Sequence, residues 1–211
     1  MSLEQQIQTL QHMIDESKKL VFFGGAGVST ESGIPDFRGE DGLYRQRYAY
    51  PPETIISHSF YVHHPEIFFD FYRNRMLYPN AKPNIVHRKL AQWEKEGKLL
   101  AVVTQNIDGL HQMAGSQNVY ELHGSVHRNT CQKCGARYTL EELLTLGDVP
   151  KCPKCGGRGK PDVVLYEPDR QRRARRDSPR GSADCRRNVA DGVPRRRVPR
   201  RIPRQSARAH Q

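Results

Sequence analysis

The chain has 211 residues, a length that fits one domain with a small insert and allows a hydrophobic core. Its net charge of +11 suggests a polyanionic partner, but residues 168–211 carry 15 Arg, 4 Asp and neither Lys nor Glu, which accounts for the whole excess. Residues 1–167 are therefore neutral overall, which argues against nucleic acid as their partner. Because no run of about 18 apolar residues is present, we expect no membrane span and a cytoplasmic protein.

The first elements predicted are an N-terminal helix and a buried strand. Apolar residues recur at helical spacing from Leu3 to Ile14, which predicts an amphipathic helix that ends near Ser17. The apolar run 20–23 then stops at Gly24–Gly27, which is typical of a parallel strand that enters a tight glycine turn. The glycines of such a turn let a pyrophosphate approach backbone N–H groups, although a plain turn fits this short motif equally well.

The middle of the chain alternates helices and strands. Residues 34–60 show no sustained period, which predicts a long functional loop. His64–Met76 and Pro83–Glu96 have helical patterns, and apolar strands are expected at 99–104 and 119–122, each followed by polar residues. Strand character resumes at Asp162–Tyr166. This order predicts an α/β fold with a Rossmann-like parallel sheet, whose site lies at the carboxyl ends of the strands.

Two cysteine pairs form the most specific motif. Cys131 and Cys134 are followed, after 17 intervening residues, by Cys152 and Cys155. Four thiolates close a tetrahedral shell around one zinc ion, and a shell without an open position indicates a structural zinc. Four unligated thiols are the alternative, whereas a thioredoxin-like role does not explain two spaced pairs. We therefore expect a small four-cysteine zinc-ribbon insert at residues 128–160.

A histidine stands at the end of the third predicted strand. His123 follows residues 119–122 and precedes Gly124, which places an imidazole at a strand's carboxyl end. An imidazole there can act as a general base near neutral pH, although a hydrogen-bonded core histidine is the common alternative. Asn106 and Asp108 follow the neighbouring strand, so the three side chains are expected to share one crevice.

Together the spaced motifs resemble the sirtuin family, particularly its bacterial members. The resemblance covers residues 1–167 and rests on the cysteine pairs and on five segments: Gly25–Ser29, Gly33–Arg38, Gln105–Asp108, His123-Gly124 and Lys160–Val164. It implies that residues 1–167 are the N-terminal part of a sirtuin catalytic domain. The implied activity is NAD-dependent protein-lysine deacetylation, with NAD as co-substrate, one structural zinc, and acetyl-lysine proteins or peptides as partners.

The resemblance also implies a role for each matching residue. His123 would be the catalytic base, which deprotonates a ribose hydroxyl after the acetyl-lysine oxygen has displaced nicotinamide. Val163 and Val164 would pair with the substrate peptide as an added strand. Tyr72 and Arg75 are similar to the pair that reads acidic acyl groups in desuccinylating sirtuins, although a surface helix rich in Tyr and Arg also produces this spacing. Contacts to NAD would come from Gly25, Ala26, Gly27, Ser29, Thr30, Phe37, Arg38, Gln105, Asn106, Ile107 and Asp108.

Residues 168–211 depart from the family pattern. A complete sirtuin continues with a Gly-Thr-Ser strand end and further strands near the far ribose and adenine. Residues 186–199 can be encoded so that loss of one base yields GGTSLTVYPAAGF, which resembles that segment. We therefore expect a frameshift near residue 168, a disordered Arg/Pro-rich tail, and a sheet that lacks its C-terminal strands.

Loss of these strands leads us to expect impaired activity for the chain as written. Two other functions remain open from the sequence. One is a zinc-ribbon nucleic-acid-binding protein that uses the basic tail. The other is a non-catalytic NAD or ADP-ribose binder, which His123 distinguishes from an enzyme.

Overall fold

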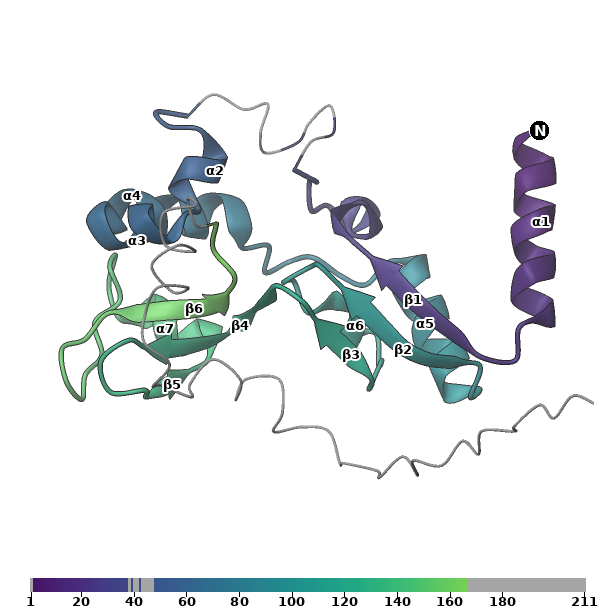
Figure 1. Ribbon diagram of the computed structural model, residues 1–211. Coiled ribbons are helices and arrows are strands. Elements are labelled where there is room, and N and C mark those ends of the chain that lie inside the picture. Colours follow the sequence, from purple (N-terminus) through teal and green to yellow (C-terminus); the bar gives the residue numbers. More distant parts are fainter. Residues whose placement is uncertain (1, 38, 40–41, 43–47, 167–211) are drawn as a thin grey trace, which may run out of the picture. The chain divides into compact units, whose positions relative to one another are not determined.

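The computed structural model describes residues 2–37, 39, 42 and 48–166. All of them belong to one compact unit, which contains two three-stranded sheets ordered β1-β2-β3 and β5-β4-β6 (Figure 1). Within this part of the chain, no helix is both long enough and apolar enough to cross a bilayer.

The elements alternate along the chain much as predicted. The helices are α1 (Leu3–Glu16), α2 (Pro52–Ile55), α3 (His58–His63), α4 (Pro65–Phe71), α5 (Ile85–Lys95), α6 (Leu110–Met113) and α7 (Leu140–Thr145). Short 3-10 turns η1 (Ala26–Val28) and η2 (Thr30–Ser32) follow the first strand, and a π-helical segment η4 (Tyr72–Met76) extends α4. The strands are β1 (Leu20–Gly24), β2 (Leu99–Thr104), β3 (Val119–Glu121), β4 (Gly124–Cys131), β5 (Arg137–Tyr138) and β6 (Gly159–Val163).

The sheet β1-β2-β3 is parallel, which confirms the predicted fold class. Phe22 on β1 lies opposite Val102 on β2, and Val102 lies opposite Val119 on β3. The chain leaves the three strands at the same edge of the sheet, because parallel strands present their carboxyl ends together. This edge carries the polar residues that the sequence placed after each strand.

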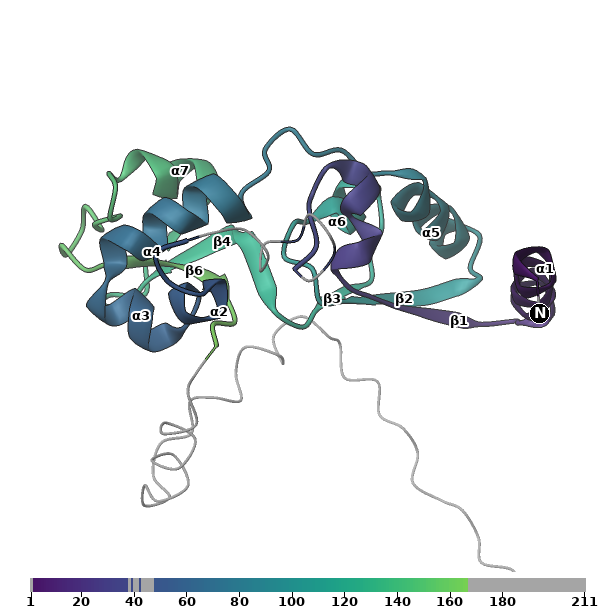
Figure 2. The ribbon, with the colours of Figure 1, turned by 90° about the horizontal axis from the view of Figure 1, so that it is seen from above.

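Helices cover one face of this parallel sheet. Helices α5 and α6 lie on one side of the three strands (Figure 2), and Leu90, Leu99 and Val102 are buried there. Successive side chains of a strand point to opposite faces, so Val21 and Phe23 of β1 point away from this core. They are 60% and 62% exposed. Among the described residues, the second face of the sheet is therefore open.

The antiparallel sheet β5-β4-β6 contacts a larger core built from helices. Strand β4 pairs with β5 on one side and with β6 on the other. Helices α2, α3, α4 and α7 contribute most of the apolar side chains. The aromatic core, as we call it, consists of the buried residues Ile55, Ile56, Phe60, Tyr61, Phe68, Phe69, Phe71, Tyr72, Val126, Leu140, Leu143 and Val163.

Three local expectations differ from the structure. The long loop predicted over 34–60 is wrong in its last part, where α2 and the start of α3 form because Ile55, Ile56 and Phe60 are drawn into the aromatic core. The predicted helix 64–76 changes to π-helical hydrogen bonding after Phe71. The strand expected from Asp162 begins earlier, as β6, because its first residues pair with the end of β4.

Candidate functional site

A cavity of about 510 Å³ opens at the carboxyl ends of the parallel strands. Its walls include four segments that are far apart in the sequence. They are the glycine loop (residues 25–33), the polar loop (residues 105–108), His123, and residues 163–166 at and after the end of β6. The cavity therefore joins the parallel sheet to the antiparallel one.

The glycine loop presents its backbone to the cavity. Ala26, Gly27 and Ser29 line the wall, as does Phe37 farther along the chain. A Cβ built on Gly27 would meet no atom within 4 Å, so a ligand can approach the main chain closely at this point. This space fits a dinucleotide co-substrate. Thr30 lies outside the wall and donates through Oγ1 to the carbonyl oxygen of Gly27 (2.9 Å).

The predicted NAD contacts Gly25 and Arg38 differ from those that line the cavity. Gly25 begins the glycine loop but is not part of the cavity wall. Arg38 lies outside the described residues. Gln105 and Ile107, which were predicted beside Asn106 and Asp108, line the cavity together with them.

A buried hydroxyl connects the glycine loop to the polar loop. Ser29, which is 1% exposed, donates through Oγ to Oδ2 of Asp108 at 2.7 Å and accepts from Nδ2 of Asn106 at 3.0 Å. The other carboxylate oxygen of Asp108 accepts the backbone N–H of Leu110 at 2.9 Å. Hydrogen bonds within the chain thus hold both loops in one arrangement, and such preorganisation reduces the entropy cost of binding a ligand.

His123 projects into the same cavity from the start of the antiparallel sheet. Its Nδ1 lies 3.0 Å from the carbonyl oxygen of Gln105. The next residue, Gly124, has φ +79°, and a Cβ there would collide with the carbonyl oxygen of Asp162. Only glycine lets β4 and β6 approach this closely beside the imidazole.

The end of β6 forms the wall next to His123. Val163 is buried, whereas the side chain of Val164 is 66% exposed. The backbone N–H of Val164 donates to the carbonyl oxygen of His123 at 2.9 Å. The histidine and the segment predicted to pair with the substrate are therefore joined directly through their backbones.

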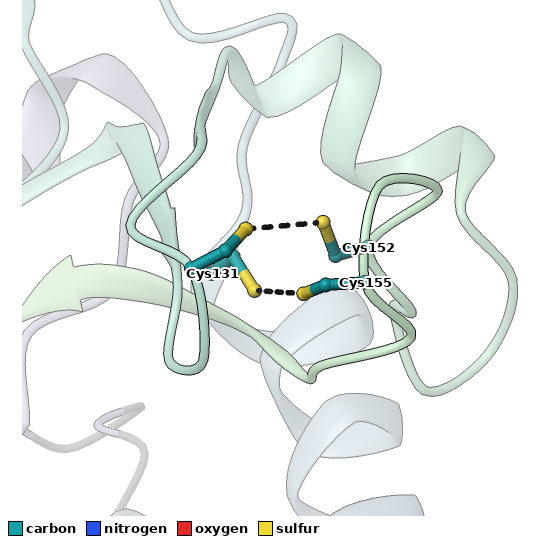
Figure 3. Close-up of side chains that lie close together, drawn as sticks. Cys131, Cys152 and Cys155 are labelled. Atoms are coloured by element: carbon teal, nitrogen blue, oxygen red, sulfur yellow. Dashed lines mark hydrogen bonds between the residues drawn. The ribbon is translucent and has the colours of Figure 1, made fainter.

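The four cysteines of the two pairs converge on one point. Their sulfur atoms all lie within 4.8 Å of one another. Cys131 and Cys155 are 3.6 Å apart (Figure 3), and so are Cys134 and Cys152. A disulfide requires about 2.05 Å. A tetrahedral zinc ion with Zn–S bonds of about 2.3 Å separates its sulfur ligands by about 3.8 Å. The cluster therefore fits a zinc ion and not a disulfide.

The surroundings of Cys131 and Cys152 favour the thiolate form that binds a metal. At Cys155, by contrast, the bond from Gly157 is outweighed by burial and by the neighbouring sulfurs, which raise the pKa of this thiol to about 12. The hydroxyl of Tyr138 lies 3.0 Å from Sγ of Cys152 and lowers the pKa of this thiol to about 6. Backbone N–H groups point at two other sulfurs, from Lys133 to Cys131 and from Gly157 to Cys155 (both 3.4 Å). Because all four positions of a tetrahedral shell are taken by protein, such an ion has no site for a substrate.

The cysteine cluster, the glycine loop and the histidine occur together in one known family. Residues 25–178 match the model of the Sir2 family. The chain belongs to the Sir2 family. This confirms the sirtuin assignment that the sequence motifs predicted.

Relatives of known name agree with this assignment. A Clostridium acetobutylicum protein named NAD-dependent protein deacetylase is 58% identical over 170 residues, which are 79% of this chain and 69% of the relative. A Sir2 complex with deacetylated p53 peptide and 3′-O-acetyl ADP-ribose is 39% identical with a TM-score of 0.70, and covers 76% of this chain and 65% of that one. A Sir2–p53 peptide–NAD+ complex is 39% identical with a TM-score of 0.66, and covers 76% and 64%. The chain therefore spans about two thirds of the length of these Sir2 proteins.

Two residues suggested as readers of the acyl group lie in different places. Arg75 lines the cavity, and its guanidinium carbon lies 5.7 Å from the ring centre of Tyr48. Tyr72 is 0% exposed, lies outside the cavity wall, and packs against the rings of Phe68 and Phe69. Both belong to η4, where π-helical turns are closed by i→i+5 bonds. Residues three apart therefore do not share a face as they do in an α-helix.

Sequence reasoning missed one histidine of this Sir2 site. His127 lines the cavity, and its Nε2 lies 3.0 Å from the carbonyl oxygen of Asp108. It follows His123 by four residues on β4, and the two imidazoles contact opposite ends of the polar loop. The four-residue spacing of the two histidines did not indicate a shared site, because β4 was not predicted as a strand.

Proposed function

We propose that the chain carries the catalytic and nicotinamide-binding part of an NAD-dependent protein-lysine deacetylase. Three features support this: membership of the Sir2 family, the printed names of the relatives above, and a cavity that combines a glycine loop, a polar loop and His123. When bound, NAD supplies the nicotinamide leaving group and the ADP-ribose that accepts the acetyl group. The residues of this chain would bind NAD, orient its nicotinamide and accept a proton.

The hydrogen bond of His123 carries the proposal, because it determines which nitrogen can act as a base. A carbonyl oxygen only accepts, so a neutral imidazole that bonds to Gln105 O at 3.0 Å holds its proton on Nδ1. Nε2 then carries the lone pair. Since His123 is exposed and lines the cavity, Nε2 can take a proton from a ribose hydroxyl.

The two loops of the cavity would hold the co-substrate. We assign the space beside Gly27 to the phosphates and ribose of NAD. The bonded set of Ser29, Asn106 and Asp108 would orient the nicotinamide. Ala26, Thr30, Phe37, Arg38, Gln105 and Ile107 remain proposed contacts from the family motifs.

The peptide substrate would lie along the end of β6. Val164 is exposed, and its main chain is bonded to that of His123. A peptide that adds as a strand along Val163 and Val164 would therefore bring its acyl-lysine close to the base. Arg75 lies in the cavity wall, where its guanidinium could pair with the carboxylate of an acidic acyl group. Acidic acyl groups are therefore worth testing as substrates. Tyr72 remains the second proposed residue of that reader.

The zinc ion would be structural, because four thiolates leave no open coordination position. We assign the zinc insert to residues 128–160, within a catalytic domain part that spans residues 1–167. The tail 168–211 lies outside the described residues, so its origin in a frameshift and its disorder stay predictions.

We propose a cytoplasmic location, which is supported by the cysteine usage. The zinc site requires reduced thiolates, and thiols persist in the reducing cytosol. Fractionation of cells that produce the chain, with western blotting, checks this. Recovery in a membrane or secreted fraction would contradict it.

The decisive test uses purified 1–211 with NAD and an acetyl-lysine peptide. We expect nicotinamide and acetylated ADP-ribose in equal amounts, at a rate well below the ~1–1000 s⁻¹ typical of enzymes, because the relatives have a further third of sequence. His123→Tyr should abolish formation of acetylated ADP-ribose, because the base acts after nicotinamide has left. Equal rates with and without the substitution would contradict the proposal, and a rate of the unsubstituted chain within the typical range would contradict the expected impairment.

The same assay compares acetyl-lysine with succinyl-lysine peptides. Arg75→Met should lower turnover of the succinylated peptide alone if Arg75 reads the acyl group. The relatives named above do not support the zinc-ribbon nucleic-acid alternative. A non-catalytic NAD binder would bind NAD equally well with and without His123 and release no nicotinamide from either.

A further inference from the structure

An asparagine behind the cavity contacts the glycine loop and has no role in the function proposed so far. Asn84 is 8% exposed and caps the N-terminus of α5, where its Oδ1 accepts from the N–H of Val86 (3.0 Å) and His87 (3.4 Å). Its Nδ2 donates to the carbonyl oxygen of Val28 at 2.7 Å. Val28 ends η1, inside the glycine loop. One side chain therefore starts a helix and also holds the loop.

A buried histidine holds Asn84 in turn. His87 is 0% exposed, and its Nδ1 lies 3.3 Å from the backbone nitrogen and 3.0 Å from Oδ1 of Asn84. Burial lowers the pKa of His87, which favours the neutral imidazole, and either tautomer of the neutral ring can bond to Asn84 through Nδ1. The ring of His87 packs against that of His111 on α6, with 4.6 Å between ring centres. His111 is itself 1% exposed.

The two histidines connect both loops of the cavity. Helix α6 begins at Leu110, whose N–H is bonded to Asp108 at the end of the polar loop. Helix α5 is capped by Asn84, which is bonded to the glycine loop. Contact between the two helices through His87 and His111 therefore links the glycine loop, at Val28, to the end of the polar loop, at Asp108.

Within the described part of the chain, the glycine loop has few other attachments to the body of the protein. Its internal bonds are local, such as the N–H of Ser29 to Ala26 and the N–H of Gly33 to Thr30. Outside the loop, Ser29 is held by the polar loop, and Val28 is held by Asn84. The bond from Asn84 to Val28 thus attaches the glycine loop to a residue outside the cavity wall.

We propose that Asn84 is a positioning residue that holds the glycine loop in its co-substrate-binding conformation, with His87 holding the Asn84 backbone. This role in NAD binding rests on the proposed function, but the order of the loop can be measured without NAD. The simpler alternative is that Asn84 is only a helix cap. The two roles differ in whether Nδ2 matters.

Asn84→Asp separates them. Aspartate caps a helix as well as asparagine does, so α5 keeps its N-terminus, while the donor to Val28 O is replaced by a carboxylate that repels it. Asn84→Ser, which also caps but is too short to reach the loop, serves if the first variant does not fold. Asn84→Ala removes both functions. Thr139→Ala is the matched control, because Thr139 caps α7 in a capping box away from the glycine loop.

Hydrogen–deuterium exchange of the full chain measures the loop directly. With Asn84→Asp we expect amide exchange in residues 28–33 to become about tenfold faster, with no change in residues 86–95. With Asn84→Ala both segments should exchange faster. With Thr139→Ala only the region of α7 should change. Loop exchange in Asn84→Asp equal to that of the unsubstituted chain would overturn the proposal.

NAD titration distinguishes this proposal from the function on which it rests. Asn84→Asp should raise the dissociation constant for NAD about tenfold and leave that for the acetyl-lysine peptide unchanged. An unchanged NAD affinity beside faster loop exchange would overturn the positioning role. If the unsubstituted chain does not bind NAD, the proposed function fails, and the exchange experiment alone decides whether Asn84 holds the loop.

Discussion

The aromatic core and the parallel sheet are two regions of one chain that are closed to different degrees. Around the aromatic core, helices α2, α3, α4 and α7 pack with strands β4 and β6. Among the described residues, the buried cluster against the parallel sheet consists of Leu90, Leu99 and Val102, and the face with Val21 and Phe23 is exposed. The region with the cysteine cluster and the end of β6 therefore has its own hydrophobic support, whereas the region with the glycine loop has less.

The apolar face of α1 agrees with this contrast. None of the residues of α1 is buried, although Leu3, Ile7, Leu10 and Met13 form an apolar stripe and are each more than half exposed. Burial of such a stripe normally supplies most of the stability of a helix in a protein. Stability of the N-terminal region should therefore be lower than that of the zinc-bearing region.

The largest expected effect comes from the zinc site. Structural zinc contributes about 10–16 kcal/mol to the folding of small zinc-finger peptides. Cys152→Ser should therefore eliminate the bound zinc, measured as metal content per chain, and speed amide exchange across residues 131–159. The parallel sheet should change little, because its support is separate. Cys185→Ser, at the cysteine outside the two pairs, is the control, and retention of a full equivalent of zinc by Cys152→Ser would contradict the assignment.

A matched pair of leucine truncations measures the two cores directly. Leu143 in the aromatic core is 0% exposed, and Leu90 beneath the parallel sheet is 3% exposed. Leucine-to-alanine changes in cores cost about 2–5 kcal/mol, and less where the surroundings can collapse into the space. We expect Leu143→Ala to lie near the upper end and Leu90→Ala near the lower end, by urea unfolding. Equal losses would show that the two cores are equally well packed.

The buried histidine pair predicts an acid sensitivity of the sheet region. Burial, aided by His87, lowers the pKa of His111 to about 4, while Asp108 opposes the shift. The unfolded chain binds a proton below about pH 6.5 and the folded chain does not. The free energy of unfolding should therefore be highest above pH 6.5 and fall by up to about 3 kcal/mol as the pH drops toward 4.

His111→Leu isolates this effect, because leucine has no proton to bind. We expect the variant to lose the acid-dependent part of the decrease when unfolding is followed at pH 4.5 and 7.5. The zinc site also loses ligands in acid, so the difference between variant and unsubstituted chain is the measured quantity. An identical pH dependence in both proteins would show that His111 does not contribute.

The smallest effect on stability is expected at the open face. Phe23→Glu should change the free energy of unfolding by only about 0.5 kcal/mol, because the side chain is 62% exposed. It should nevertheless reduce self-association, measured by light scattering, since exposed apolar faces and sheet edges promote it. Val62→Glu, at a residue 42% exposed on α3, is the control. Unchanged light scattering with Phe23→Glu would mean that the exposed face of the parallel sheet does not promote self-association.

The sequence predicted the parts of this molecule that depend on local pattern or on fixed spacing. The strands at Leu99 and Val119, the cysteine cluster and the crevice that holds His123 and Asp108 follow from periodicity and motif. The π-helical turn after Phe71 could not be predicted, because it results from packing in the aromatic core. The bond from Asn84 to Val28 joins residues 56 positions apart, and no local pattern encodes a contact of that separation.

Gly124 couples His123 to the end of β6, so the two would be exchanged together between related proteins. Its missing side chain lets the strand that starts after His123 lie against Asp162, and Val164 then bonds back to His123. The proposed base and the proposed peptide-binding edge are thus joined in one structural unit, which belongs to the zinc-bearing sheet. A chimera that exchanges residues 123–166 with a relative would import acyl-lysine preference and proton acceptor as a matched set, while the recipient kept its own way of holding NAD.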